Sequence, residues 1–206
     1  MKLCYMPGTC ALAPHIALHW VGRPFELRKI ERDKLQSPEF LKINPQGKVP
    51  VLIEDDGRAL TEAGAILQYL AEKFPEAHLG PGDGILQRYE MNQWISHLGG
   101  NVHPAFYPFY MTARYHPDPA QHAAMKEQAK TQIHKQMELM EGQMKGRDWV
   151  LESRKTIIDA YLFAIFRWNK FLPRPLTDYP DLNRWYQKMG EDSGVQKALA
   201  EQKLEL

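Results

Sequence analysis

The chain has 206 residues, a net charge of +1 and two cysteines, and these numbers already exclude several classes of protein. The length is enough for one large domain or two small ones, with a hydrophobic core that needs no disulfide or metal. Its 26 Lys and Arg are balanced by 25 Asp and Glu. Without a basic excess to neutralise a row of phosphates, we expect no nucleic-acid partner.

The N-terminal segment has one Lys in front of a mostly apolar stretch, as a secretory signal would, but Pro7, Pro14, His15 and His19 interrupt it. No run approaches the roughly 20 apolar residues that span a bilayer, so we expect no membrane association. Two cysteines are too few for a secreted disulfide scaffold and fit a reducing compartment. The sequence therefore predicts a cytoplasmic protein.

The first 75 residues alternate between strand and helix patterns. A short apolar run at 2–6 ends at Pro7-Gly8 and predicts a strand, and apolar residues at helical spacing predict a helix over 11–21. Further along we expect a strand over 25–30, a short helix that begins at Ser37-Pro38, a hairpin over 49–60 and a helix over 63–74. This order predicts a small α/β domain.

After this region the strand pattern does not return. Residues 75–84 contain two prolines and three glycines, a composition typical of a boundary between domains. We therefore predict an α/β domain over 1–75, a linker over 76–84 and an all-α domain over 85–206. Its helices are expected at 85–97 (interrupted by Gly99-Gly100 and near Pro104), 119–145, 156–171, 182–190 and 195–204.

Thr156 and Asp159 have the spacing of a helix capping box, in which each side chain bonds to the backbone of the other residue. The run that follows, 160–166, is apolar on every side of the expected helix. A helix of this kind lies in the centre of a core. We therefore interpret Asp159 as a folding element and give it no catalytic role.

Cys10 is the most suggestive candidate for chemistry. It lies after a predicted strand and a Pro-Gly turn and directly before a predicted helix. Amide groups and the helix dipole at such a place lower the pKa of a thiol from about 8.5 toward neutrality and favour the reactive thiolate. A small buried apolar side chain is an equally good interpretation of Cys10. For Cys4, in the middle of a strand, packing is the better one.

Two further positions have both a functional and an ordinary interpretation. A cis peptide bond at Pro50 would turn the backbone of Val49 outward to pair with a peptide-like ligand, but a proline that begins a strand is common. Glu62 and Ala63 lie at the start of a predicted helix. In the functional interpretation, the amides there would bind a carboxylate and Glu62 would accept from an ammonium group. A normal helix cap explains them as well. Taken alone, the sequence favours the ordinary interpretation at both positions.

Metal and nucleotide chemistry are not expected. His15 and His19 are four residues apart on one predicted helix, but no third ligand follows at a spacing typical of zinc sites. The sequence has no glycine-rich phosphate loop and no Gly-x-Ser-x-Gly motif. We predict no metal.

Several segments occur together in an order typical of one family. They are the opening 1–18 with its Pro-Gly-x-Cys motif, Asn44-Pro45-x-Gly-x-Val-Pro-x-Leu, Leu60-Thr-Glu-x-x-Ala-Ile-x-x-Tyr-Leu, Trp149-Val-Leu with Thr156-x-x-Asp, and Tyr179-Pro-x-Leu-x-x-Trp. Over nearly its full length the chain resembles the cytosolic glutathione S-transferases, most of all the bacterial beta class. The resemblance implies a thioredoxin-like N-terminal domain, an all-α helical-bundle C-terminal domain and a homodimer.

The resemblance also implies glutathione as co-substrate and a role for particular residues. Val49, beside a cis Pro50, would pair with the cysteinyl part, while Glu62 and Ala63 hold the γ-glutamyl end. The remaining implied residues are Cys10 beside the glutathione sulfur, where it can form a mixed disulfide, His103 as the active-site histidine, Thr9 near the thiolate and Lys34 near the glycine carboxylate. An aromatic pocket for small electrophiles would be formed by Met6, Phe106, Tyr107, Tyr110 and Trp168.

Two departures from the family pattern keep three functions open. Ala11 stands where the beta class has a serine hydroxyl, so Thr9, Tyr5 or Cys10 would have to stabilise the thiolate. Pro104 replaces a lysine. We predict a transferase that conjugates glutathione to small, apolar or aromatic electrophiles. The alternatives are a thioltransferase or peroxidase that works through a Cys10 mixed disulfide, and a non-catalytic binding module of the same fold.

Overall fold

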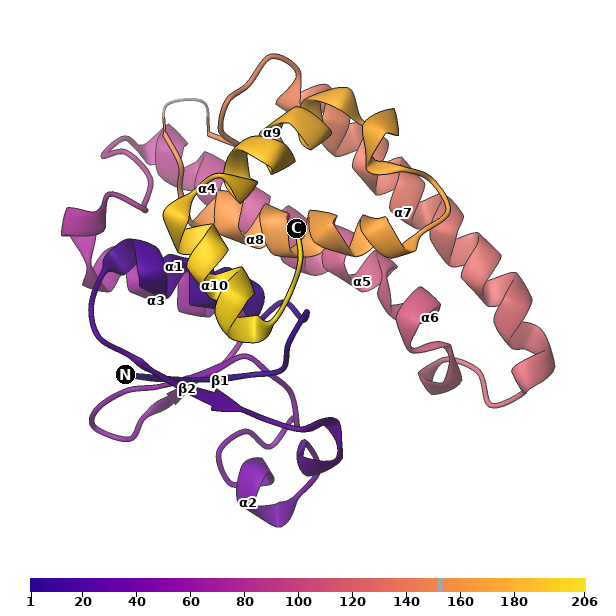
Figure 1. Cartoon of the computed structure of the whole chain (residues 1–206), viewed down its shortest axis with the longest axis horizontal. Helices are drawn as coiled ribbons and strands as arrows, with labels where there is room; N and C mark the ends of the chain where they lie inside the picture. The colour runs from indigo at the N-terminus through magenta and orange to yellow at the C-terminus, as the bar shows by residue number, and fades with distance from the viewer. Residues whose placement is uncertain (152–153) are drawn as a thin grey trace.

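The computed structural model describes residues 1–151 and 154–206, and its N-terminal part is a four-stranded sheet with helices on it (Figure 1). The predicted order of strands and helices is confirmed. The elements are β1 (Lys2–Tyr5), α1 (Leu12–Val21), β2 (Glu26–Lys29), α2 (Pro38–Leu41), β3 (Val51–Ile53), β4 (Ala59–Leu60) and α3 (Ala63–Lys73). Together they form a thioredoxin-like domain.

The sheet is mixed, with strand order β2-β1-β3-β4. β1 runs parallel to β2 and antiparallel to β3, and β3 and β4 form the antiparallel hairpin that the sequence predicts. α1 packs against α3 on one face of this sheet and against the C-terminal helices on its other side. This double contact explains why α1 is buried from Leu12 to Leu18.

The rest of the described chain is helical, as predicted, and no strand follows Leu60 in the ranges described. Its helices are α4 (Ile85–His97), α5 (His103–Ala105), α6 (Tyr107–Tyr110), α7 (His122–Met144), α8 (Ile157–Phe166), α9 (Pro180–Gly190) and α10 (Ser193–Gln202). A π-helical segment, Leu98–Val102, separates α4 from α5, where the sequence predicts an interruption. The helix predicted over 156–171 is shorter, because the chain tightens into a 3-10 helix at Arg167–Phe171.

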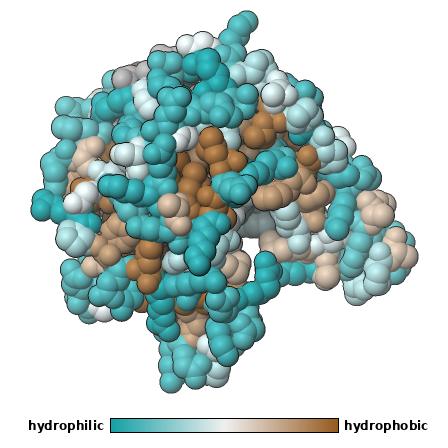
Figure 2. Space-filling view, viewed as in Figure 1, coloured by the Kyte–Doolittle hydropathy of each residue, from teal (hydrophilic) through white to brown (hydrophobic). Residues whose placement is uncertain are grey.

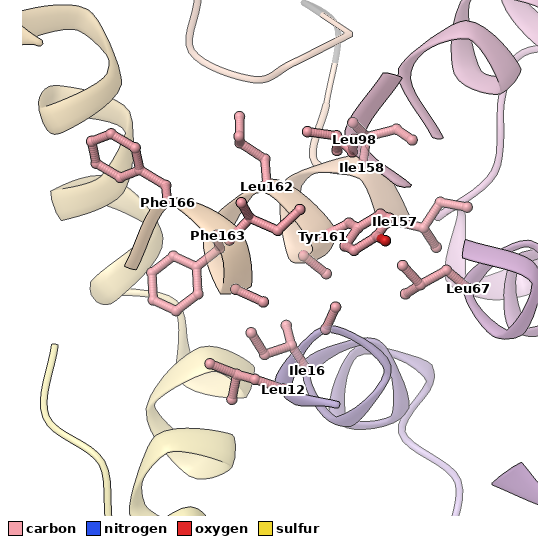
Figure 3. Packing of buried hydrophobic residues seen from close by; sticks show 14 of the residues in the cluster. Leu12, Ile16, Leu67, Leu98, Ile157, Ile158, Tyr161, Leu162, Phe163 and Phe166 are labelled. Carbon is pink, nitrogen blue, oxygen red and sulfur yellow. The ribbon is translucent and has the colours of Figure 1, made fainter. Parts of the chain in front are cut away.

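Helix α8 is the centre of the C-terminal domain, and every one of its residues is buried. Figure 3 shows its apolar side chains meeting residues from three other elements: Leu12 and Ile16 of α1, Leu67 of α3 and Leu98 of the π-helical segment. The prediction of a central, buried helix is confirmed. Since α1 and α3 belong to the N-terminal domain, the same core joins the two domains.

The capping box at the start of α8 is confirmed, and Asp159 does more than cap. Its Oδ2 accepts from the backbone N–H of Thr156 at 2.8 Å. Its Oδ1 accepts from the backbone N–H of Val150 and from the indole of Trp185, both at 3.0 Å. Burial raises the pKa of Asp159 to about 6, although these donors favour the carboxylate. One buried carboxylate therefore ties α8 to the preceding loop and to α9.

The face of the molecule seen in Figure 2 is mainly hydrophilic. Figure 2 shows hydrophobic residues gathered in the middle of this face and a recess toward the arm formed by α6 and α7. Within the described parts of the chain, none of the helices combines the length and apolarity needed to cross a membrane.

We expect Asp159→Ala to lower the free energy of unfolding by about 3 kcal/mol or more, because several buried donors lose their acceptor at once. Chemical denaturation with urea would measure the change. Asp118→Ala is the matched control, since Asp118 accepts from Ala120 N–H at an exposed helix start and its loss costs about 1 kcal/mol. Equal effects of the two substitutions would contradict the structural role of Asp159.

Candidate active site

A cavity of about 320 Å³ lies between the N-terminal domain and the helices that follow it. The N-terminal domain contributes Cys10, the segment around cis Pro50 and the start of α3. The C-terminal domain contributes residues of α4, the π-helical segment, α5, α6 and α8. The lining residues are Cys10, Asn44, Gln46, Lys48, Val49, Pro50, Thr61, Glu62, Ala63, Gly64, Ala65, Ile95, Ser96, Gly99, Gly100, His103, Tyr107 and Tyr161.

Cys10 lies in the turn that leads from β1 to α1. Its thiol contacts the carbonyl oxygen of Val49, with Sγ and O 3.8 Å apart. The two positions are 39 residues apart in the chain, and the fold brings them to one wall of the cavity. This is the contact that makes Cys10 a candidate for chemistry with a peptide-like ligand bound along Val49.

The placement of Cys10 before a helix predicts a lowered thiol pKa, and this prediction is wrong. Burial raises the pKa of this thiol to about 12, and the carboxylate of Glu62 raises it further, while Lys48 and a backbone hydrogen bond act in the opposite direction. Helix α1 begins only at Leu12, so Cys10 precedes its first turn. Desolvation of the thiolate outweighs the dipole of the helix.

The peptide bond between Val49 and Pro50 is cis, as the resemblance implies and contrary to what the sequence alone favours. The loop before it is fixed by Asn44, whose Nδ2 donates to Lys48 O at 2.7 Å and whose Oδ1 accepts from Gln46 N–H at 3.1 Å. Gly47 has a φ of +59°, and a Cβ there would lie 2.8 Å from Leu35 O. The Asn-Pro-x-Gly pattern is thus a requirement of the loop backbone.

Glu62 adopts a backbone conformation that few residues other than glycine adopt, with φ 65° and ψ 116°. It directly precedes α3, and its Oε1 accepts from Gln46 Nε2 at 3.3 Å. Ala63 and Gly64, in the first turn of α3, line the cavity, and backbone amides in a first turn have no partner within the helix. Backbone strain clusters at ligand-binding sites, and the Glu62 side chain makes no capping hydrogen bond to α3.

His103 starts α5 on the C-terminal side of the cavity. A hydrogen bond of 3.4 Å joins its Nδ1 to the hydroxyl of Tyr161, and its ring centroid lies 4.9 Å from that of Tyr107. Burial lowers the pKa of His103 to about 4, and Lys48 lowers it as well. The imidazole is therefore neutral at pH 7 and can donate one hydrogen bond and accept another.

Two predicted glutathione ligands lie outside the cavity lining. The hydroxyl of Thr9 donates to Met6 O at 2.7 Å and accepts from Ala11 N–H at 3.3 Å, so it serves the turn before α1. Lys34 lies in an exposed 3-10 helix, where it pairs with Asp33 at 3.4 Å. The structure does not bring either side chain to the cavity.

Of the residues predicted to form the acceptor pocket, only Tyr107 lines the cavity. Phe106 is buried, with 1% of its surface exposed, and it stacks on Tyr110 and contacts Trp168 edge-on. Trp168 donates from its indole to Gly8 O at 2.8 Å. These three aromatic residues and Met6 lie outside the cavity lining, although the ring of Trp168 lies 4.9 Å from that of the lining residue His103.

Sequence analysis missed several lining residues. Gln46 and Lys48 belong to the segment before Pro50, and their place in that segment is the signal that points to them. The sequence predicts Tyr161 as part of an apolar core, although its hydroxyl is the one polar side-chain group in the run 160–166. It predicts Gly99 and Gly100 as a helix interruption, and in the structure Gly99 leaves room beside the Tyr161 hydroxyl, 3.5 Å from where a Cβ would stand.

Comparison with known proteins points to one family. The model described as Glutathione S-transferase, N-terminal domain matches residues 3–78, and the model described as Glutathione S-transferase, C-terminal domain matches residues 101–192. Glutathione S-transferase GST-4.5 of Xanthomonas campestris pv. campestris is 37% identical over 200 residues, which cover 97% of each chain.

Solved structures agree with this result. A sphingomonad glutathione S-transferase complexed with glutathione has a TM-score of 0.89, 33% identity and complete coverage of both chains. The bacterial beta class enzyme of Sphingomonas chungbukensis has a TM-score of 0.90, 33% identity and complete coverage of both chains.

We expect the unliganded protein to react slowly with iodoacetamide at pH 7, because burial holds the pKa of Cys10 near 12 and only the thiolate reacts. The rate should rise with pH up to about 12. Mass spectrometry after timed alkylation would report each cysteine separately, with Cys4 as the internal control because burial raises its pKa too. A Cys10 rate that levels off below about pH 8 would contradict the desolvation argument.

Proposed function

The chain belongs to the glutathione S-transferase family, and we propose that its cavity binds glutathione and delivers the sulfur as a thiolate to small electrophiles. The observation that supports the proposal is the meeting, in one cavity, of Cys10, the Val49 backbone beside cis Pro50, and the strained start of α3 at Glu62. Each predicted segment has a plain structural interpretation alone. A cavity that collects all three fits an extended tripeptide.

Charges along the cavity match the two ends of glutathione. The carboxylate of Glu62 would accept from the γ-glutamyl ammonium, and the free amides of Ala63 and Gly64 would bind the adjacent carboxylate. Lys48 also lines the cavity, and its ammonium would bind the glycine carboxylate, the role that the resemblance assigns to Lys34. The cysteinyl part would then pair with the backbone of Val49, which places its sulfur beside Cys10.

The reaction is the transfer of a thiolate to an electrophilic carbon. A carbon–sulfur bond forms, and a leaving group departs or a strained ring opens, with the electron pair going to the departing atom. No serine hydroxyl follows Cys10, because the next residue is Ala11. Among the residues that line the cavity, the thiol of Cys10, the neutral imidazole of His103 and the hydroxyl of Tyr161 are donors that can stabilise the sulfur anion.

A second activity is favoured by the position of Cys10 on the cavity wall. Its thiolate can attack a disulfide that contains glutathione, form a mixed disulfide and release the other thiol. A second glutathione thiolate then attacks the mixed disulfide, which gives oxidised glutathione and frees Cys10. This sequence needs only glutathione as reductant and would make the protein a thioltransferase.

We further propose a cytoplasmic homodimer of the beta class that acts in detoxification. The exposed apolar residues Ile85, Leu86 and Tyr89 at the start of α4 supply a surface that a second copy would cover. The two free cysteines fit a reducing compartment. The similarity to the beta class enzyme of Sphingomonas chungbukensis supports the class.

Calorimetry with glutathione and turnover of a halonitrobenzene test the proposal together. We expect binding in the micromolar to millimolar range and measurable conjugation. Binding without conjugation, but with reduction of a mixed disulfide, would favour the thioltransferase. Weak binding with neither activity would favour the non-catalytic binding module.

We expect Glu62→Gln to raise the KM for glutathione by about 10- to 100-fold, because a hydrogen bond between charged groups is worth about 1.5–3 kcal/mol. Steady-state kinetics with varied glutathione would measure it. Glu39→Gln, a change at an exposed carboxylate on α2, is the control and should leave the KM unchanged. The assignment of Glu62 fails if the two variants behave alike.

Cys10→Ala separates the two activities. If Cys10 forms the mixed disulfide, the variant loses thioltransferase activity completely. Conjugation becomes slower with the loss of one donor but persists, since glutathione supplies the nucleophile and His103 and Tyr161 still line the cavity. Cys4→Ala is the matched control, because Cys4 is fully buried in β1, away from the cavity. A Cys10→Ala variant with the full thioltransferase rate would exclude the covalent route.

A further inference from the structure

His15 and His19 meet a third side chain of a metal-binding type, which residue spacing does not predict. They are one turn apart on α1, and Glu201 reaches them from α10, which packs along α1. Glu201 Oε2 lies 2.6 Å from His15 Nε2 and 2.8 Å from His19 Nε2. The cluster is separate from the active-site cavity, since none of the three residues lines it.

We propose that His15, His19 and Glu201 form a binding site for a divalent transition-metal ion such as Zn²⁺, with solvent as the fourth ligand. Two imidazole nitrogens and one carboxylate oxygen are a ligand set that zinc accepts, and histidines at i and i+4 of a helix aim at one point. The three candidate ligand atoms lie within 4.8 Å of one another. The ligand set comes from two helices that are already packed together.

Only a small movement is needed to admit the ion. With bonds of about 2.1 Å and tetrahedral angles, two zinc ligands stand about 3.4 Å apart. The carboxylate must therefore withdraw by less than about 1 Å from each histidine, and the two imidazole nitrogens, which lie within 4.8 Å of each other, must come to about the same 3.4 Å spacing. The Glu201 side chain is 43% exposed, while His15 is fully buried and His19 is 13% exposed. The two histidines thus form the inner part of the site, and Glu201 is the ligand on the solvent side.

Gln202 sets the protonation of the buried histidine. Its Oε1 accepts from Gly8 N–H at 3.2 Å, so its Nε2 is the atom that faces His15 Nδ1 at 3.0 Å. His15 therefore accepts at Nδ1 and carries its proton on Nε2, where it donates to Glu201. A metal at Nε2 requires the proton on Nδ1, and Gln202 must then turn its oxygen toward His15 and release Gly8.

Gln202 favours the proton on Nε2, whereas metal binding needs it on Nδ1, and a substitution at Gln202 can therefore test the proposal. In Gln202→Glu, one carboxylate oxygen can keep the Gly8 bond while the other accepts from His15 Nδ1–H. A carboxylate behind a metal-bound histidine is the partner found in many metal sites and raises the basicity of the ligand. Gln202→Glu should therefore bind the metal more tightly than the wild-type chain, whereas a simple hydrogen-bonded cluster gains nothing from it.

The test uses the full chain with Co²⁺ as a spectroscopic probe and Zn²⁺ as its competitor. We expect one saturable site per chain, with visible absorption typical of nitrogen and oxygen ligands. His19→Ala and Glu201→Gln should each weaken binding by at least about tenfold, because each removes one protein ligand. Gln202→Glu should strengthen it. His122→Ala and Glu191→Gln, which change the same residue types outside the cluster, are the controls and should bind as the wild type does.

Three results would overturn the proposal: no saturable binding in the micromolar range, wild-type affinity in both His19→Ala and Glu201→Gln, or a thiolate-to-cobalt charge-transfer band that places the ion on a cysteine. Circular dichroism of each variant verifies folding. If Gln202→Glu fails to fold because its new carboxylate is buried, the two ligand variants and their controls still decide the question.

Discussion

The apolar contact between α1 and α8 is the constraint on which the site depends. Leu12 and Ile16 of α1 meet the buried side chains of α8 in a single core (Figure 3). The turn before α1 carries Cys10, and α8 carries Tyr161, so this packing sets the distance between the two walls of the cavity. Because cores are close-packed, a change of one methylene group at this contact shifts the residues of both walls.

The same packing explains why the cavity holds so little charge of its own. His103 is neutral because burial lowers its pKa to about 4, and burial also raises the pKa of Tyr107 to about 12. The charged residues that line the cavity, Glu62 and Lys48, come from the loops of the N-terminal domain. A ligand with charged ends and a neutral centre suits this distribution, as an extended tripeptide with a thiol in its middle does.

The family resemblance, and not the local pattern taken alone, pointed to those parts of the cavity that a continuous segment builds. The Asn44–Pro50 loop and the Glu62–Ala63 helix start belong to this class, because their geometry follows from neighbouring residues. Of the residues predicted for the acceptor pocket, all but Tyr107 lie outside the cavity lining. Phe106 and Trp168 meet only through the packing of distant helices, which residue spacing does not fix. The contact of Glu201 with the two histidines could not be predicted for the same reason, since 182 residues separate Glu201 from His19.

The pKa of Cys10 depends on the relative size of two opposing effects, the helix dipole and burial. A helix dipole contributes about 0.3–1 kcal/mol to a charge near its end, less than the 1.36 kcal/mol of one pKa unit. Burial can shift a pKa by about 3–5 units, and it controls the thiol here. A thiolate in this cavity therefore needs a cation or hydrogen-bond donors brought close to the sulfur. Glutathione carries an ammonium group, and in the proposed binding mode it would pair with Glu62 and compensate the carboxylate charge that raises the pKa of Cys10.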